Sequence, residues 1–180
     1  MRVDDITIDL NGHKLLLRNP EADDAQMLID YLIQTSKETR FLAREPEEAD
    51  ISIEAETGFI NYQNESENCL MLLGLLDGEY VGNCTLMGRT SMRCEHRASI
   101  AIALYQRFTG MGIGTKMLET LCAIAKEQGY EQLELEVVAE NQPAIALYKK
   151  MGFEIFGTLP HNMKYRDGTY ADVCWMMKTL

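Results

Sequence analysis

The chain has 180 residues, of which 46% are hydrophobic and 25% are charged, and this composition is typical of a globular protein. Its length suits one domain with a filled core and is short for two, so a single domain over residues 1–180 is expected. The 17 basic and 28 acidic residues give a formal net charge of −11. Binding to nucleic-acid phosphates needs a concentrated basic surface, so this charge argues against a nucleic-acid partner.

The cysteines and histidines are scattered and show no metal-ligand spacing. No C-x-x-C pair occurs, and the five cysteines are expected to be free thiols in the cytoplasm. No stretch approaches the roughly 18 apolar residues of a membrane span, and the first residues lack the apolar run of a signal peptide. The sequence therefore predicts a cytoplasmic protein with no metal and no membrane partner.

Turn dipeptides and apolar periodicity define the elements of the N-terminal part. Asn11-Gly12 and Asp77-Gly78 are dipeptides that form two-residue hairpin turns, and a helical spacing of apolar residues starts at Ala25. The expected order is a hairpin of strands 6–10 and 14–18, a helix, an irregular segment over 37–50, a helix over about 52–63, a hairpin of strands 69–76 and 79–87, and a strand over about 98–104.

The remaining elements follow a glycine-rich loop, Gly110-Met-Gly-Ile-Gly114, which leads into a helix that Gly129 ends as a left-handed cap. The next strand, 133–138, alternates apolar and acidic residues. Asn141 is expected to be the N-cap of a short helix that carries Tyr148. The last two strands are expected over about 153–159 and 171–178.

This order, β-β-α-α-β-β-β-α-β-α-β-β, predicts an α/β (α+β) domain. The sheet is expected to be mixed and mostly antiparallel, with about seven strands and about four helices. Parallel neighbours need a long crossover connection, and only the strand, glycine loop, helix and strand over residues 98–138 supply one. A central parallel βαβ unit is therefore predicted.

The glycine loop is the first functional signal. A glycine loop between a strand and a helix presents free backbone N–H groups at the positive end of a helix dipole, which suits phosphate. A tight turn that binds nothing is the alternative. A P-loop is excluded because Lys116 lies one place too late and no Ser or Thr follows it. A dinucleotide fingerprint fits poorly, since the loop reads G-x-G-x-G and Glu134 lies inside the following strand.

Two segments resemble the signatures of the GNAT superfamily of acetyltransferases. The run YQRFTGMGIGTKML at 105–118 is similar to the acetyl-CoA loop Q/R-x-x-G-x-G/A, except that Thr109 stands where Gln or Arg is usual. The run EVVAENQPAIALYKKMGF at 136–153 resembles the second signature, N-x-x-A-x-x-L-Y-x-x-x-G-F. The resemblance covers residues 69–180, and the N-terminal third agrees in element order only.

The resemblance implies a set of coenzyme contacts. The loop's backbone N–H groups would hold the pyrophosphate, and the end of the preceding strand would pair with the pantetheine arm in a gap between two splayed strands. Asn141 would contact the coenzyme arm beside Ala144, and Tyr148 would lie near the sulfur. The loop and strand residues are Ile102, Ala103, Leu104, Gly110, Met111, Gly112, Ile113, Gly114 and Thr115.

Acyl transfer from a thioester to an amine needs a neutral amine, a stabilised oxyanion and a protonated leaving thiolate. Tyr148 is the expected general acid by this resemblance, whereas packing of its ring is the reading from residue chemistry alone. The general base stays open, because no pattern separates the possible groups from a relay through a water molecule. These groups are Glu45, His96, Glu134 and Glu136.

The sequence thus predicts an N-acetyltransferase that uses acetyl-CoA and a primary amine, either a small molecule or a protein amino group. Transfer is expected to be direct, because no cysteine lies in the two signatures and Cys122, on the helix that follows the glycine loop, faces the apolar side of that helix. A non-catalytic acyl-CoA-binding or sensing domain is the alternative, and transfer to a hydroxyl or of a longer acyl group is not excluded. The acceptor and a homodimer are left open.

Overall fold

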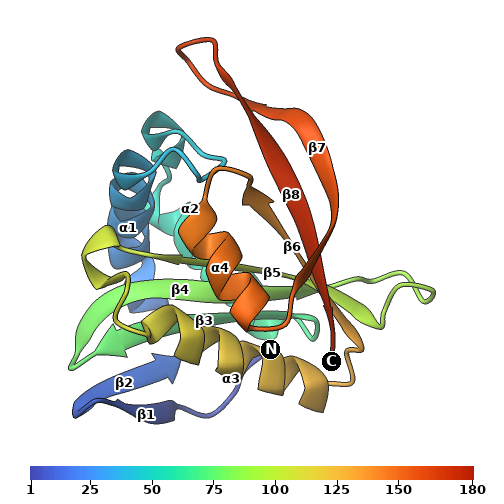
Figure 1. Ribbon diagram of the computed structural model, residues 1–180. Helices are drawn as coiled ribbons and strands as arrows, with labels where there is room; N and C mark the ends of the chain where they lie inside the picture. Colours follow the sequence, from blue (N-terminus) through green and yellow to red (C-terminus); the bar gives the residue numbers. More distant parts are fainter.

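The computed structural model describes all residues 1–180, and a single eight-stranded sheet runs through it in the order β1-β2-β3-β4-β5-β6-β8-β7 (Figure 1). The strands are β1 Ile6–Leu10, β2 His13–Arg18, β3 Cys69–Leu76, β4 Glu79–Gly88, β5 Arg97–Leu104, β6 Gln132–Val138, β7 Glu154–Lys164 and β8 Tyr170–Thr179. The helices are α1 Ala25–Glu38, α2 Ile53–Glu65, α3 Ile113–Glu127 and α4 Gln142–Lys150, with short 3₁₀ turns η1 Ala22–Asp24, η2 Pro46–Ala49 and η3 Gln106–Phe108.

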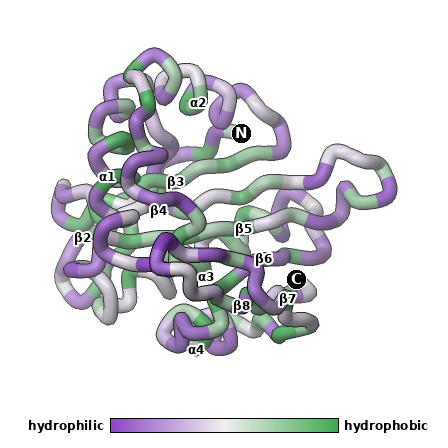
Figure 2. Tube along the Cα trace, turned by 90° about the horizontal axis from the view of Figure 1, so that it is seen from above, coloured by the Kyte–Doolittle hydropathy of each residue, from purple (hydrophilic) through white to green (hydrophobic).

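The helices cover both faces of the sheet. Successive residues of a strand point to opposite faces, so β3 packs Leu70 and Leu72 against α3 and α4, and Met71 and Leu73 against α1 and α2. Figure 2 shows the hydrophobic residues following the central strands between these two layers. β3 is consequently buried along almost its whole length.

The predicted fold class is confirmed: all eight strands of the predicted order lie in the sheet, for which about seven strands were expected. Both predicted hairpin turns form, because Asn11 and Asp77 take φ of 55° and 51° ahead of a glycine at 89°. One boundary was wrong: β7 continues to Lys164, through residues expected to be a loop. The extension passes an irregular register between Leu159 and Met163, and no local sequence signal marks such a bulge.

The only parallel pair, β5 with β6, is short. Its register runs from Arg97 opposite Gln132 to Ser99 opposite Glu134, and no pairing continues beyond it. The two strands diverge after that point (Figure 1). The rest of β5 stays paired to β4 as far as Leu104 opposite Gly82. An opening in the sheet therefore begins halfway along β5 and faces the glycine loop.

Gly82 lets β4 approach the far end of β5 closely. Its φ is 144°, and an alanine Cβ there would overlap the Ala103 carbonyl oxygen and lie 2.7 Å from the Leu104 Cα. Gly82→Ala is expected to lower the free energy of unfolding by about 3 kcal/mol, from backbone strain plus overpacking. Urea denaturation measures this change.

Gly78→Ala is the matched control. Gly78 also has a positive φ, 89°, but nothing lies within 4 Å of an added Cβ. Only the strain remains, so a loss of about 1 kcal/mol is expected. Equal losses for the two variants would show that the close approach of β4 to β5 contributes nothing.

Candidate active site

The glycine loop follows β5 through η3 and ends at the start of α3. Phe108 is buried and anchors the loop to the core, while Thr109 donates its hydroxyl to the Gln106 carbonyl at 2.8 Å. Gly110 and Gly112 have φ of 78° and 85°, values that an L side chain adopts at a cost. These two glycines turn the chain so that its backbone N–H groups point outward at the helix N-terminus.

The N–H groups of this loop are free. The first helical hydrogen bond runs from Lys116 N–H to the Gly112 carbonyl at 3.2 Å, and no protein acceptor takes the six N–H groups of residues 110–115. Six free donors beside the positive end of a helix dipole form an anion site. The structure therefore brings together all the loop residues that the sequence predicts.

The opening between β5 and β6 has backbone donors on both edges. Tyr105 N–H donates to the Val81 carbonyl at 3.0 Å, so the odd residues of β5 turn to β4 and the even ones, Ile102 and Leu104, turn to the opening. On β6, Ala139 N–H donates to β8 at the Asp172 carbonyl at 2.9 Å. The even residues of β6, Glu136 and Val138, therefore turn their N–H groups to the opening. These two donors were not identified from the sequence.

Ala103 turns its backbone groups away from the opening. They face β4, and its carbonyl accepts a 2.8 Å hydrogen bond from the Tyr31 hydroxyl. Because only every second residue of a strand can pair with an arm lying there, the backbone of Ala103 is not available for that pairing. Tyr31 is buried among Tyr80 and Tyr105, at ring distances of 5.3 Å, and so holds this end of β5 in place.

α4 closes the other side of the opening. Asn141 caps the helix by accepting a 3.3 Å hydrogen bond from Ala144 N–H, and its amide NH₂ is left free. Tyr148 is buried with its ring edge-on to Phe153, at a centroid distance of 6.0 Å. Burial raises the pKa of Tyr148 to about 12, so the phenol is protonated throughout the neutral range.

Comparison with known proteins agrees with this arrangement. Residues 25–153 match the acetyltransferase (GNAT) family. The chain belongs to that family. It is 32% identical over 110 residues, 59% of this chain and 66% of the relative, to the L-amino acid N-acetyltransferase AaaT of Escherichia coli. It is 40% identical over 73 residues to an N-alpha-acetyltransferase of Sulfurisphaera tokodaii, covering 40% of this chain and 42% of that protein. The matched segments span less than two thirds of both relatives.

The fold also matches solved GNAT structures. A GNAT-family acetyltransferase from Streptococcus pneumoniae superposes with a TM-score of 0.86 and 30% identity, over 92% of this chain and 99% of the other. The match covers far more of the chain than the two signatures. The family match begins at residue 25, so it includes most of the N-terminal third, for which the sequence offered element order alone.

Two of the four possible bases lie away from the opening between β5 and β6. His96 precedes β5, and the eight residues from it to Leu104 span about 26 Å. Glu134 lies in the paired part of β6, where Arg97 Nη1 and Arg89 Nη2 donate to its carboxylate at 2.8 and 3.3 Å. Because two guanidinium groups donate to this carboxylate, its oxygens are already occupied and it is poorly placed to take a proton from an amine.

The other two possible bases differ in their partners. Glu45 lies in the connection after α1 and faces Arg166 at 3.9 Å. Glu136 is exposed on β6, where it lies opposite Trp175 of β8, two positions beyond Glu134, the last residue that pairs with β5. No hydrogen bond or ion pair engages its carboxylate. Of the four groups, Glu136 is the one that lies beside the opening with a free carboxylate.

A small cluster on the α1 and α2 side of the opening was missed by the sequence interpretation. Val138, the last residue of β6, packs with Phe41 and Tyr165 in a separate apolar cluster. The Arg40 guanidinium lies 3.8 Å from the centre of the Tyr165 ring. These contacts join the segment after α1 to the β7–β8 hairpin, more than 120 positions along the chain, so no local pattern could indicate them.

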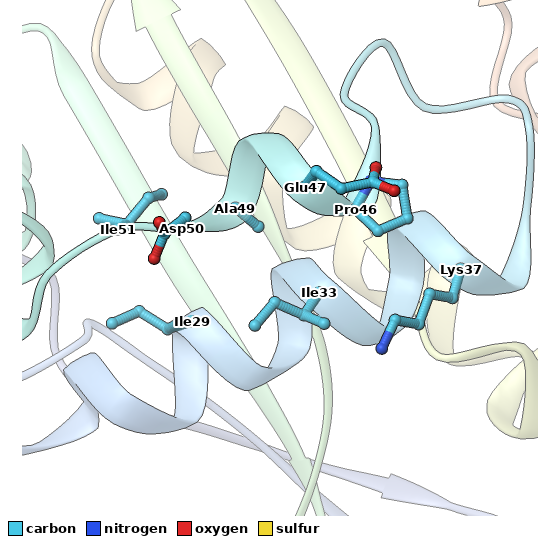
Figure 3. Close-up of a pocket in the computed structure, with 8 residues that line it drawn as sticks. All are labelled: Ile29, Ile33, Lys37, Pro46, Glu47, Ala49, Asp50 and Ile51. Carbon is cyan, nitrogen blue, oxygen red and sulfur yellow. The ribbon is translucent and has the colours of Figure 1, made fainter. Parts of the chain in front are cut away.

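A groove of about 350 Å³ lies between α1 and η2 (Figure 3). Ile29 and Ile33 of α1 face Ala49 and Ile51 across it, and Lys37 lies at one end. A second groove of about 290 Å³ includes Met111 of the glycine loop. The first groove contains none of the predicted coenzyme residues.

The structure contains no group of three or more side chains with metal-ligand chemistry. None of its helices combines the length and the apolar character needed to cross a membrane.

Proposed function

We propose that the protein transfers the acetyl group of acetyl-CoA to a primary amine, on a small molecule or a protein, by direct attack in a ternary complex. The observation that carries this proposal is the six free N–H groups of residues 110–115 beside the opening between β5 and β6. One molecule with a diphosphate and an extended amide-bearing arm fits both features, and coenzyme A is such a molecule.

The chain's own groups supply the binding. The loop donates to the diphosphate, and Ile102 and Leu104 offer the hydrogen-bonding edge of a strand to the pantetheine amides. A donor on this edge also suits the oxyanion that forms when an amine attacks the thioester, because fixed N–H groups need no reorganisation. The free amide of Asn141 is oriented by its cap to Ala144 and faces the same arm.

Two side chains suit the proton transfers. Tyr148 remains protonated at neutral pH and can donate to the departing thiolate, which would otherwise carry a full charge in a buried place. Glu136, directly or through a water molecule, accepts the proton that the amine must lose. It lies on the opposite face of β6 from Val137 and the core around α3. Acid and base therefore act from opposite faces of the opening.

The names of the relatives support an amine acceptor. One acts on L-amino acids and the other is an N-alpha-acetyltransferase. A coenzyme with its diphosphate at the N-terminus of α3 enters the opening from the face that α3 and α4 cover. The acceptor then has to approach from the α1 and α2 face, between the segment after α1 and the β7–β8 hairpin.

Direct transfer predicts intersecting double-reciprocal lines when acetyl-CoA and the amine are varied. Cys122 is buried against the core, and burial raises the pKa of its thiol, so it is poorly suited to carry the acetyl group. Cys122→Ala should keep the wild-type kcat within about twofold, since thiolate chemistry is not used. Parallel lines, together with acetylated enzyme in a mass spectrum, would rule out direct transfer.

A screen of amines with acetyl-CoA, with release of free thiol as the signal, tests the activity itself. Calorimetric binding of coenzyme A accompanied by thiol release that depends on the amine is the expected result. Tight coenzyme binding without release for any amine would instead identify a binding or sensing domain. Absence of coenzyme binding would contradict the proposal at its first step.

A further inference from the structure

Two arginines join the segment after α1 to the β7–β8 hairpin, and they differ in their partners. Arg166 of the hairpin donates to both carboxylate oxygens of Glu47, at 3.0 and 2.9 Å, and faces Glu45. Its charge is thus compensated within the protein. This pair ties the hairpin to η2 on the face from which the acceptor approaches.

Arg40 forms no direct ion pair, although its charge, after the hydrogen bonds from Thr169, helps to lower the pKa of the Asp167 carboxyl. Its Nη2 donates to the Thr169 hydroxyl at 3.0 Å, and no carboxylate lies within 4.0 Å of it. Asp167 of the same hairpin is committed to Thr169, whose N–H and hydroxyl donate to it at 2.8 and 2.5 Å. A guanidinium has five N–H donors, so several of those on Arg40 remain available to a ligand.

The position of Arg40 links this free charge to the opening. Its guanidinium stacks on the Tyr165 ring at 3.8 Å, and that ring packs in the cluster with Val138, Ala171 and Val173. Val138 ends β6 where the strands have diverged. The apolar cluster that contains this ring therefore connects Arg40 to the end of β6 at the opening.

A second polar group in this cluster is also unused. The Tyr165 hydroxyl is buried and has no hydrogen-bond partner, and such groups are rare in folded proteins because leaving them unpaired is unfavourable. The apolar neighbours Phe41, Val138 and Met163 cannot pair with it. The hydroxyl is closed off from solvent, so the donors of this cluster that a ligand can reach are those of Arg40.

We propose that Arg40 binds the carboxylate of the acceptor, and that the acceptor is therefore a free α-amino acid. This inference rests on the proposed function. In an α-amino acid the reacting amine and the carboxylate are bonded to the same carbon, so the carboxylate has to lie close to the opening, on the side where Arg40 and its cluster lie. The first residue of a polypeptide has a neutral amide there and gains much less from a guanidinium.

The overall charge makes a placed cation necessary. A protein with a formal net charge of −11 repels carboxylates at long range. A local guanidinium with free donors overcomes that repulsion only at the spot where the carboxylate has to lie. Arg40 therefore selects amino acids against other amines by orientation as well as by attraction.

The test compares L-leucine and L-phenylalanine with their amides, as acceptors for wild type, Arg40→Met and Arg40→Lys. Arg40→Met is expected to raise KM for the acids by about 10- to 100-fold, the loss of a charge-assisted contact, with little change in kcat. KM for the amides should not change. For Arg40→Lys, KM for the acids should lie between the values for wild type and Arg40→Met, because an ammonium group keeps the charge but lacks the planar fork of a guanidinium.

Arg44→Met is the matched control, since Arg44 is exposed in the same segment and makes no ion pair. It should leave all KM values unchanged. Comparing each variant with wild type on one acceptor cancels the different amine pKa values of acids and amides. Thermal denaturation and calorimetry with coenzyme A establish that Arg40→Met keeps the fold and the coenzyme site.

Three outcomes overturn the inference. The first is an equal rise in KM for acids and amides in Arg40→Met, which would indicate a structural role. The second is a wild-type preference for the amides or for a hexapeptide with a free amino terminus. That result would leave the proposed function standing. The third, no acetylation of acids, amides or peptide, would contradict the proposed function and this inference together.

Discussion

Gly112→Glu is expected to abolish the binding of coenzyme A, with Kd raised at least about 100-fold, equivalent to about 2.7 kcal/mol. The substitution places a carboxylate among the six free N–H groups, where it takes the donors and repels the diphosphate. An added Cβ meets only Leu10 Cδ1, at 3.7 Å, so the loss should come from the site rather than from unfolding. Calorimetry measures Kd.

Gly129→Glu is a closely matched control. Gly129 follows the other end of α3, has the same φ of 85° as Gly112, and has nothing within 4 Å of an added Cβ. Both variants bear the same backbone strain and the same added charge, but only one lies at the anion site. Equal Kd values for the Gly112 variant and wild type would remove the loop from the coenzyme site.

The local conformations on the predicted coenzyme side could be predicted from the sequence because their signals lie within short segments. The glycines at 110 and 112 indicate a backbone with positive φ. The Asn141 cap and the alternation of β6 likewise depend on residues only a few positions away. Such features depend on the conformation of a single short segment. The resemblance to the GNAT signatures then indicated that these local features serve one function, the binding of a coenzyme.

The acceptor side could not be predicted in the same way, because it is made by contacts between distant segments. Arg40 meets Thr169 and Tyr165 only after the hairpin has folded over the end of α1. The general base illustrates the same limit. Glu134 and Glu136 are equivalent in an alternating strand, and only the pairing of β6 with β5 shows that two arginines engage the first while the second is free.

Tyr148→Phe is expected to lower kcat by about 10²-fold with little change in the Kd of coenzyme A. The phenylalanine ring can keep the edge-on contact with Phe153, so packing is preserved and only the hydroxyl is lost. Without a donor the thiolate leaves as a charged group in a buried place. Tyr130→Phe, which also changes a partly buried tyrosine against the same core, should leave kcat unchanged.

The pH profile separates a donating phenol from one that only packs. A Tyr148 pKa of about 12 keeps the acid protonated through pH 10, while an amine acceptor near pKa 10 becomes increasingly neutral over the same range. The wild-type kcat/KM should therefore rise with pH and show no alkaline fall below about pH 10. In Tyr148→Phe the rising limb should keep its position, because it reports the amine and its base, and the whole curve should lie lower. Unchanged kcat on a good acceptor, with an unchanged profile, would assign Tyr148 to packing alone and leave protonation of the thiolate to solvent.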